Sequence, residues 1–185
     1  MDPLELLMHP VRLRIVHALS GGHTRTVAEL CSRMPDVSQA TVYRHVGSLV
    51  EGGLLEVADE RRVHGAVERR YRLQPARTAI KAETGAAMSL AEHRETFAAA
   101  VAALVAEFNA YLDRDDAQPF RDGVGYRQMA LWLNRRELAR LQRELARMVG
   151  AVRDNRPGGG RRQYLVSPIV FPIEEASPGA GDGDG

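Results

Sequence analysis

The sequence of residues 38–51 is SQATVYRHVGSLVE. It begins with Ser38, a favoured N-cap residue, and its apolar residues recur at the spacing of one buried helix face. The opposite face carries polar side chains that can donate to or accept from base edges and phosphates. These are Gln39, Thr41, Arg44, His45 and Ser48. The pattern predicts a helix that buries one side and leaves a polar side free.

A second helix is predicted immediately before this stretch. Residues 26–34 are TVAELCSRM, in which Thr26 and Glu29 have the spacing of a capping box. Pro35 then ends the helix, and residues 35–37 form a short turn of the length used in a helix-turn-helix motif.

The residues after the stretch predict a hairpin. Gly52 and Gly53 favour the left-handed conformation that ends a helix. Strands are expected at residues 54–59 and 67–73, joined by a polar tip, ERRVHGA, at residues 60–66. A helix-turn-helix followed by a basic hairpin is the arrangement of a winged helix.

Residues 7–73 resemble the DNA-binding domain of the ArsR-type winged-helix repressors. Three strings carry the resemblance, and they cover a little over a third of the chain. They are HPVRLRIVHAL at residues 9–19, TVAELCSRM at residues 26–34 and SQATVYRHVGSLVEGGLL at residues 38–55. The resemblance implies a dimeric transcriptional regulator whose affinity for an operator changes with a signal.

Length and composition narrow the class of protein. The chain has 185 residues and a single cysteine, Cys31, which excludes an intrachain disulfide. It has no run approaching the roughly 18 apolar residues of a membrane span, and its first twenty residues carry charges where a signal peptide would be apolar. We therefore expect a cytoplasmic protein with no membrane partner.

The net charge of +1 does not by itself indicate a nucleic-acid partner. Binding would have to depend on a local stripe of arginines, whose planar guanidinium groups suit phosphate and guanine. The stripe expected from the motif is Arg44, Arg61, Arg62, Arg70 and Arg72. The alternative is that these are solvated surface charges.

The second half has its own pattern of elements. We expect a connecting helix at residues 76–87, a helix of about six turns after Ser89, a strand at 126–133, a helix from Asn134 to about Gly150 and a strand at 164–173. The long helix would serve as a dimer seam or as a core helix of its own chain. The predicted domains are 1–75, 76–173 and a disordered acidic tail at 174–185. The fold class is α+β, mainly α: a winged helix-turn-helix domain, a long helix and a small strand-helix-strand unit.

Four aromatic residues of the second half are candidates for an effector site, because ligand pockets are mostly apolar. They are Tyr111, Phe120, Tyr126 and Trp132. The alternative is that they belong to a core. Metal sensing, known in the resembling family, is not expected, because Cys31 stands alone and a soft metal needs several thiolates.

Taken together, these patterns predict a sequence-specific DNA-binding transcriptional regulator, a repressor, that binds an inverted-repeat operator as a homodimer. We expect neither enzymatic activity nor a cofactor, because no catalytic or phosphate-binding motif can be placed. The predicted DNA-binding residues are Ser38, Gln39, Thr41, Tyr43, Arg44, His45, Ser48, Arg61, Arg62 and His64. The alternatives are a winged-helix module that docks another protein and a DNA-binding regulator that has no ligand.

Overall fold

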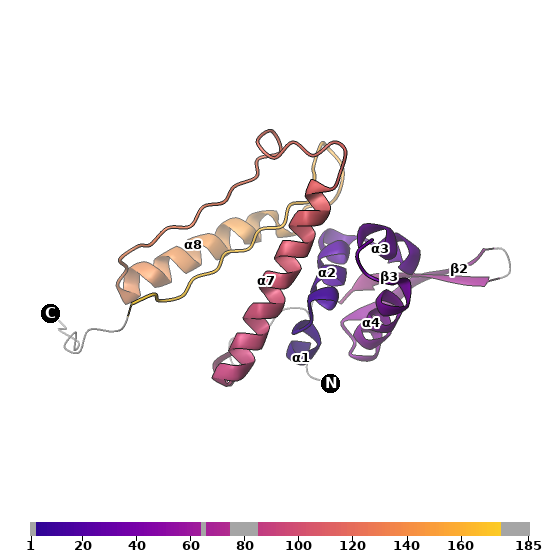
Figure 1. Ribbon diagram of the computed structural model, residues 1–185, viewed down its shortest axis with the longest axis horizontal. Coiled ribbons are helices and arrows are strands. Elements are labelled where there is room, and N and C mark those ends of the chain that lie inside the picture. The colour runs from indigo at the N-terminus through magenta and orange to yellow at the C-terminus, as the bar shows by residue number, and fades with distance from the viewer. Residues whose placement is uncertain (1–2, 64–65, 75–84, 175–185) are drawn as a thin grey trace.

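The computed structural model describes residues 3–63, 66–74 and 85–174 (Figure 1). The N-terminal elements are α1 (Pro3–Leu7), α2 (Pro10–Leu19), the single turn η1 (Ser20–Gly22), β1 (Arg25–Thr26), α3 (Val27–Arg33), α4 (Gln39–Glu51), β2 (Leu55–Val63) and β3 (Ala66–Leu73). Two long helices follow, α7 (Leu90–Leu112) and α8 (Arg135–Arg153). The prediction of a winged helix followed by a long helix is confirmed.

The buried hydrophobic cluster lies in the N-terminal domain. Its members come from α1, α2, α3, α4 and the residues that lead into β2. They are Leu6, Leu7, Ile15, Ala18, Leu19, Val27, Leu30, Met34, Val42, Val46, Leu49, Leu54 and Leu55. Because each large apolar side chain contributes roughly 1.5–3 kcal/mol when fully buried, this cluster is what holds α3 and α4 in place.

Both ends of the helix-turn-helix are fixed by local signals. Thr26 and Glu29 form the predicted capping box of α3, and the Ser38 hydroxyl caps α4. At the other end of α4, Gly53 has a φ of 71° and Leu54 N–H donates to the Leu49 carbonyl, which is a Schellman cap. Gly52 is right-handed instead, and a Cβ there would lie 2.0 Å from a methyl group of Leu6. It is therefore needed for close packing and not for its backbone conformation.

The sheet has the antiparallel order β1-β3-β2, and a bulge lies between Val57 and Asp59. The strands of the wing are longer than predicted, because residues 60–63 belong to β2 and Ala66 begins β3. Most of the predicted polar tip is therefore paired strand. Residues 64–65 lie outside the described ranges.

Helix α7 begins with the predicted capping box of Ser89 and Glu92 and packs on α2 (Figure 1). The fully buried residues on it are Ala99 and Ala103, so small side chains allow the two helices to approach closely. Among the described residues, α7 is also the one helix long and apolar enough, at a mean hydropathy of 1.2, to meet the criterion for a membrane span.

The C-terminal half differs from the prediction. Helix α8 is present and begins with a capping box of Asn134 and Glu137, but the predicted strands at 126–133 and 164–173 are wrong for this chain taken alone. Both segments are irregular, and Figure 1 shows them running the length of α8. The physical reason is that a strand needs a partner, and neither segment lies in register beside another one.

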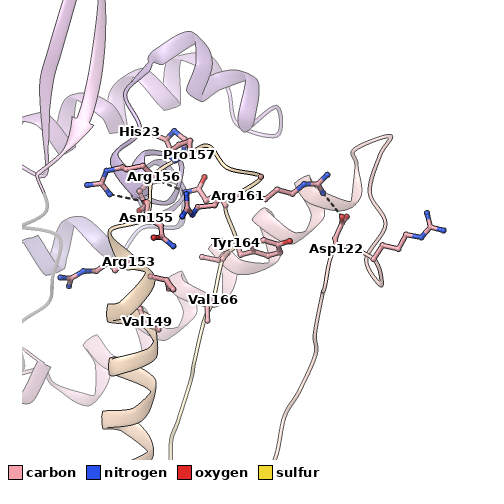
Figure 2. A pocket seen from close by; sticks show the side chains of 18 residues that line it. His23, Asp122, Val149, Arg153, Asn155, Arg156, Pro157, Arg161, Tyr164 and Val166 are labelled. Carbon is pink, nitrogen blue, oxygen red and sulfur yellow. Dashed lines mark hydrogen bonds and ion pairs between the residues drawn. The ribbon is translucent and has the colours of Figure 1, made fainter.

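A cavity of about 1090 Å³ lies between η1 and the C-terminal end of α8 (Figure 2). The glycine-rich loop after α8 forms part of its wall, with Gly158, Gly159 and Gly160 all at positive φ. Gln163 ties this region to the N-terminal domain, because its side-chain amide donates to the carbonyl of His17 at 2.8 Å.

Some predicted segments lie outside the described residues. These are residues 76–84 of the connecting helix and residues 175–185 of the tail. The division into domains at residues 75 and 173 stays a prediction.

Candidate nucleic-acid interface

Helix α4 buries one face in the core and leaves the other uncovered. Val42, Val46 and Leu49 are buried, as the periodicity predicted. On the open side, Gln39 and Arg44 are exposed and Tyr43 is 54% exposed. Among the described residues, Arg44 has no acidic partner, so its guanidinium group is available to a ligand that carries negative charge.

The hydroxyl groups near the start of α4 are already engaged. The Ser38 hydroxyl accepts from the backbone N–H of Thr41 at 3.3 Å and donates to the Thr41 hydroxyl at 2.8 Å. Ser48, one turn after Arg44, donates to the Arg44 carbonyl at 3.2 Å. Ser38 therefore sets where the helix begins. Within the part of the chain that the structure describes, the side chains of Gln39, Tyr43 and Arg44 have no hydrogen-bond partner.

His45 differs from the expectation that it lies on the open face. Its side chain is buried, at 7% exposure, and its ring centroid lies 4.2 Å from that of His9. Burial, followed by the charges of His9, Arg12 and Arg44, lowers the pKa of His45 to about 4. The imidazole is therefore neutral at physiological pH and packs beneath the helix, where it cannot contact a base.

Most arginines of the wing are paired with carboxylates of the same hairpin. Arg61 Nε lies 3.0 Å from an oxygen of Asp59, Arg69 Nε lies 2.8 Å from Glu60, and Arg72 contacts Glu56. These pairs are at least partly exposed, so each is worth little in stability, and a phosphate group could replace the carboxylate. Arg62 is exposed and has no ion pair among the described residues. His64 lies outside them.

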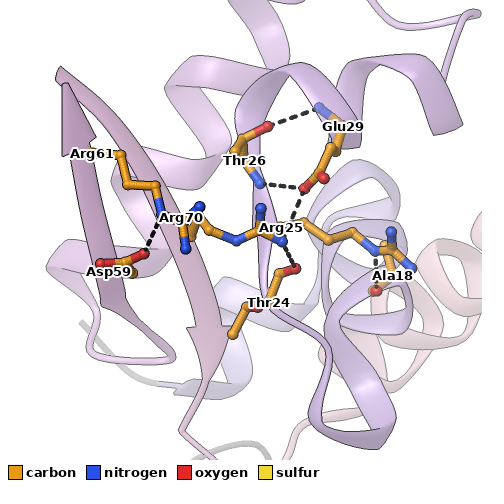
Figure 3. A network of polar contacts seen from close by, with 8 residues as sticks. All are labelled: Ala18, Thr24, Arg25, Thr26, Glu29, Asp59, Arg61 and Arg70. Carbon is orange, nitrogen blue, oxygen red and sulfur yellow. Dashed lines mark hydrogen bonds and ion pairs between the residues drawn. The ribbon is translucent and has the colours of Figure 1, made fainter. Parts of the chain in front are cut away.

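Arg70 is held on the sheet instead of extending toward solvent with the rest of the predicted stripe. Figure 3 shows its side chain between the wing and the start of α3. One terminal nitrogen donates to the carbonyl of Thr24 at 2.9 Å and lies 3.7 Å from Glu29 of the capping box. Arg70 therefore braces the sheet against α3, and the basic stripe reduces to Arg44, Arg61 and Arg62, with Arg72 beside Glu56.

The turn between α3 and α4 is anchored by a residue that the sequence did not single out. Arg14 of α2 is 2% exposed and donates two hydrogen bonds to Asp36 in that turn, at 2.6 and 2.9 Å. Its Nε also lies 3.5 Å from Glu107 of α7. Because of its hydrogen bonds with Arg14, Asp36 has a lowered pKa. Arg14 lies beside the apolar face of α2, but no local pattern could show that its partner is 22 residues away.

The four aromatic candidates of the second half do not form one pocket. Tyr111 and Tyr126 both pack on Phe108, at 6.0 and 5.8 Å between ring centroids, and the Tyr111 hydroxyl donates to Asp122 at 2.7 Å. Partial burial, followed by this hydrogen bond, raises the pKa of Tyr111 to about 12. Phe120 and Trp132 are 98% and 85% exposed. None of the four lines the cavity at the end of α8.

The comparison with known families agrees with this geometry. Residues 7–58 match a family model described as a helix-turn-helix domain. The matched range runs from the end of α1 into β2 and includes α3, the turn and α4. No curated protein matches the chain. The fold, the open face of α4 and this match together define a winged helix-turn-helix protein of the class of DNA-binding transcription regulators.

Proposed function

We propose that this protein is a repressor that binds an inverted-repeat operator as a homodimer and inserts α4 into the major groove. The observation that carries the proposal is the open face of α4, on which Gln39 and the unpaired Arg44 project from a helix whose other face is fixed in the core. Arginine pairs with two acceptors of guanine, and glutamine pairs with adenine in the same groove. These two side chains would therefore select the sequence.

The remaining contacts would position the protein on the duplex. Thr41 and Tyr43 lie beside Arg44 at the edge of the open face and suit sugar or phosphate contacts. Arg62 on β2 is free for phosphate, and Arg61 can exchange Asp59 for it. Contacts of this kind fix register without reading bases. Two copies of α4 in successive major grooves about 34 Å apart would require an operator with two inverted half-sites.

The experiment is a DNA-binding titration with two matched variants. Arg44→Ala should cost about 1–3 kcal/mol and relax the base preference at one position of each half-site. Arg62→Ala should weaken binding to all sequences alike and reduce the salt slope by about one for each lost phosphate contact. Arg94→Ala on α7 removes the same charge from an exposed site away from α4 and should leave binding unchanged. Unchanged affinity and selectivity in Arg44→Ala would refute the proposal.

A second candidate is a winged helix that docks another protein. It is favoured by one observation, that the carboxylates of the wing already neutralise Arg61, Arg69 and Arg72. A protein-docking module would show no salt-dependent binding to random duplex DNA or heparin, whereas a DNA-binding protein loses affinity steeply as salt rises.

The place of a small-molecule effector is a separate question. Because Tyr111, Phe120, Tyr126 and Trp132 do not share a cavity, their arrangement favours a second half that serves as dimer scaffold over one that binds a ligand at these residues. Thermal-shift measurements with candidate small molecules distinguish the two, because a ligand present at 100 times its dissociation constant stabilises the folded state by about 2.7 kcal/mol. As a DNA-binding regulator, the protein would act in the cytoplasm.

A further inference from the structure

The C-terminal arm, which we define as residues 124–173 with α8 at its centre, has no core of its own. None of the described residues from 113 to 174 is buried, although many are large and apolar. Trp132, Tyr126 and Val166 are 85%, 73% and 71% exposed. Soluble proteins rarely leave contiguous apolar patches of more than a few hundred Å² open to water. Such a surface therefore indicates a contact that the single chain does not supply.

The area of the whole molecule agrees with this conclusion. The chain exposes 14184 Å², whereas a compact protein of 20.4 kDa exposes about 8,800 Å². Even if all residues outside the described ranges were fully exposed, an excess of about 2,000 Å² would remain. This is the area that each partner of a large, obligate dimer buries, since such interfaces cover about 2,000–5,000 Å² in total.

The backbone of the two extended segments of the arm, on either side of α8, is also without partners in the described chain. Within the described chain, no backbone hydrogen bond joins residues 125–133 or residues 163–173 to another segment. Both segments have the alternating or apolar composition of strands. Unpaired strand edges of this length are templates for pairing with another chain.

The prolines of the second segment leave one of its edges intact. In a strand, the N–H groups of consecutive residues point to opposite edges, so that every second residue shares an edge. Pro168 and Pro172 are four apart and remove donors from the same edge. The other edge keeps the donors of Leu165, Ser167, Ile169 and Phe171. If residues 164–173 form a strand, it can therefore pair fully on that edge only.

Helix α8 supplies a half-covered apolar seam beside these segments. Its residues Leu138, Leu141, Leu145, Met148 and Val152 follow the three-four spacing of a coiled-coil seam. The first three are partly covered, and Met148 and Val152 are 60% and 57% exposed. The helix also carries six arginines and two glutamates, so two copies of α8 placed directly side by side would repel each other. The extended segments are therefore better suited than α8 to contact a second copy of the chain.

We propose that the arm is the dimer interface of this protein and that a second copy of the chain covers it, with the free edge of residues 164–173 paired antiparallel to a strand of the partner's arm. A two-fold axis makes such pairing self-complementary, because each copy offers the same edge and the same apolar face. The predicted strands at 126–133 and 164–173 then form between chains. This proposal deepens the homodimer of the proposed function, but it does not depend on whether α4 binds DNA.

The first test is the mass of the full-length protein in solution without DNA, measured by light scattering or sedimentation. The wild-type chain should be a dimer at micromolar concentration. A combined Trp132→Glu and Val166→Asp variant places charges at side chains already exposed in the single chain, so it should fold and shift to monomer, with the dissociation constant raised at least tenfold. Val67→Asp, at a 53% exposed apolar site on the wing, is the control and should remain dimeric. A monomeric wild-type chain, or a dimer that the arm variant leaves intact, would overturn the proposal.

The second test examines the strand edge itself. Ile169→Pro removes a donor from the free edge, whereas Val170→Pro removes one from the edge that Pro168 and Pro172 already block. The two side chains are similarly exposed, at 45% and 50%, so they are closely matched. Ile169→Pro should weaken the dimer at least tenfold more than Val170→Pro. Equal effects would overturn the strand pairing.

A measurement on the unmodified protein covers the case in which a variant fails to fold. In the dimer, the amides of Leu165, Ile169 and Phe171 should exchange with solvent more slowly than on dilution to monomer. Exchange that is fast at every concentration would overturn the proposal. DNA binding is a separate readout. Arg44→Ala should remain dimeric while its affinity and selectivity for the operator fall, and the arm variant should lose tight operator binding while keeping weak binding to any duplex.

Discussion

The bond between Arg14 and Asp36 should be worth more to the fold than its half-exposed position implies. Asp36→Ala leaves the Arg14 guanidinium, which is 2% exposed, with Glu107 at 3.5 Å as its one remaining acidic partner among the described residues. Breaking a fully buried ion pair costs about 3–5 kcal/mol. Because the Asp36 side chain is 54% exposed and Glu107 remains, we expect a loss of about 2–3 kcal/mol from the free energy of unfolding.

Replacing Arg14, the other partner of the bond, should lower the free energy of unfolding by less. Arg14→Met places an apolar side chain of similar length in the buried site, and the Asp36 carboxylate returns to water. Replacing a buried charge by an apolar group is often close to neutral, so we expect a loss within about 1 kcal/mol. Urea unfolding of both variants, with equal denaturant slopes, measures the difference. The reasoning is refuted if Arg14→Met costs more than Asp36→Ala, or if Asp36→Ala costs less than about 1 kcal/mol.

The pH dependence of stability should also report the bond between Arg14 and Asp36. The pKa of Asp36 in the folded protein is lowered by its hydrogen bonds with Arg14, from an ordinary value of 3.8. The stability that this bond contributes is therefore fully present above that value and is lost as pH falls through the lower folded pKa. The difference in stability between the wild-type protein and Asp36→Ala should shrink below about pH 4.

Three further predictions concern the packing around α4 and the cap of α3. Gly52→Ala should lower the free energy of unfolding by about 1–3 kcal/mol, because its Cβ would lie 2.0 Å from Leu6. Gly47→Ala, whose Cβ would meet nothing within 4 Å, should instead stabilise the helix by about 0.5–1 kcal/mol. Equal effects of the two changes in thermal or urea unfolding would contradict the contact with Leu6. In NMR titrations, His45 should titrate near pH 4 and not near its ordinary 6.5. Between these two values only the unfolded chain protonates His45, so the stability of the wild-type protein should fall from pH 6.5 towards 4 more steeply than that of His45→Phe. Thr26→Ala removes the cap of α3 and should cost about 1 kcal/mol, and a neutral result would show that the capping box adds nothing.

Local signals predicted the N-terminal domain well. The capping box of Thr26 and Glu29, the cap at Ser38 and the glycines after α4 each act within a few residues, so their pattern in the sequence is enough to place α3 and α4. The irregular course of residues 126–133 and 164–173, where strands were expected, could not be predicted in the same way. Alternation at residues 126–133 is local, but a strand exists only when a second one lies beside it, and this depends on parts of the molecule that sequence spacing does not report.

The candidate site could be predicted only in part, for the same reason. The helical period placed Arg44 on the open face, which the structure shows to be exposed. It placed His45 there too, and the structure buries that residue under His9, which comes from the start of a different helix. The pairing of Glu60 with Arg69 depends on the register of β2 and β3, and the bulge at Val57 shifts that register by one residue. Position on one helix is thus predictable, whereas contacts between elements are not.

The contacts of Arg14 have a mechanical consequence. One guanidinium group joins α2, the turn that leads into α4, and α7 through Glu107. A displacement of α7 by an ångström or more would stretch its contact with Arg14 and disturb the position of Asp36, which lies in the turn directly before α4. The long helix is thereby linked to the orientation of α4 through the side chains of Arg14, Asp36 and Glu107.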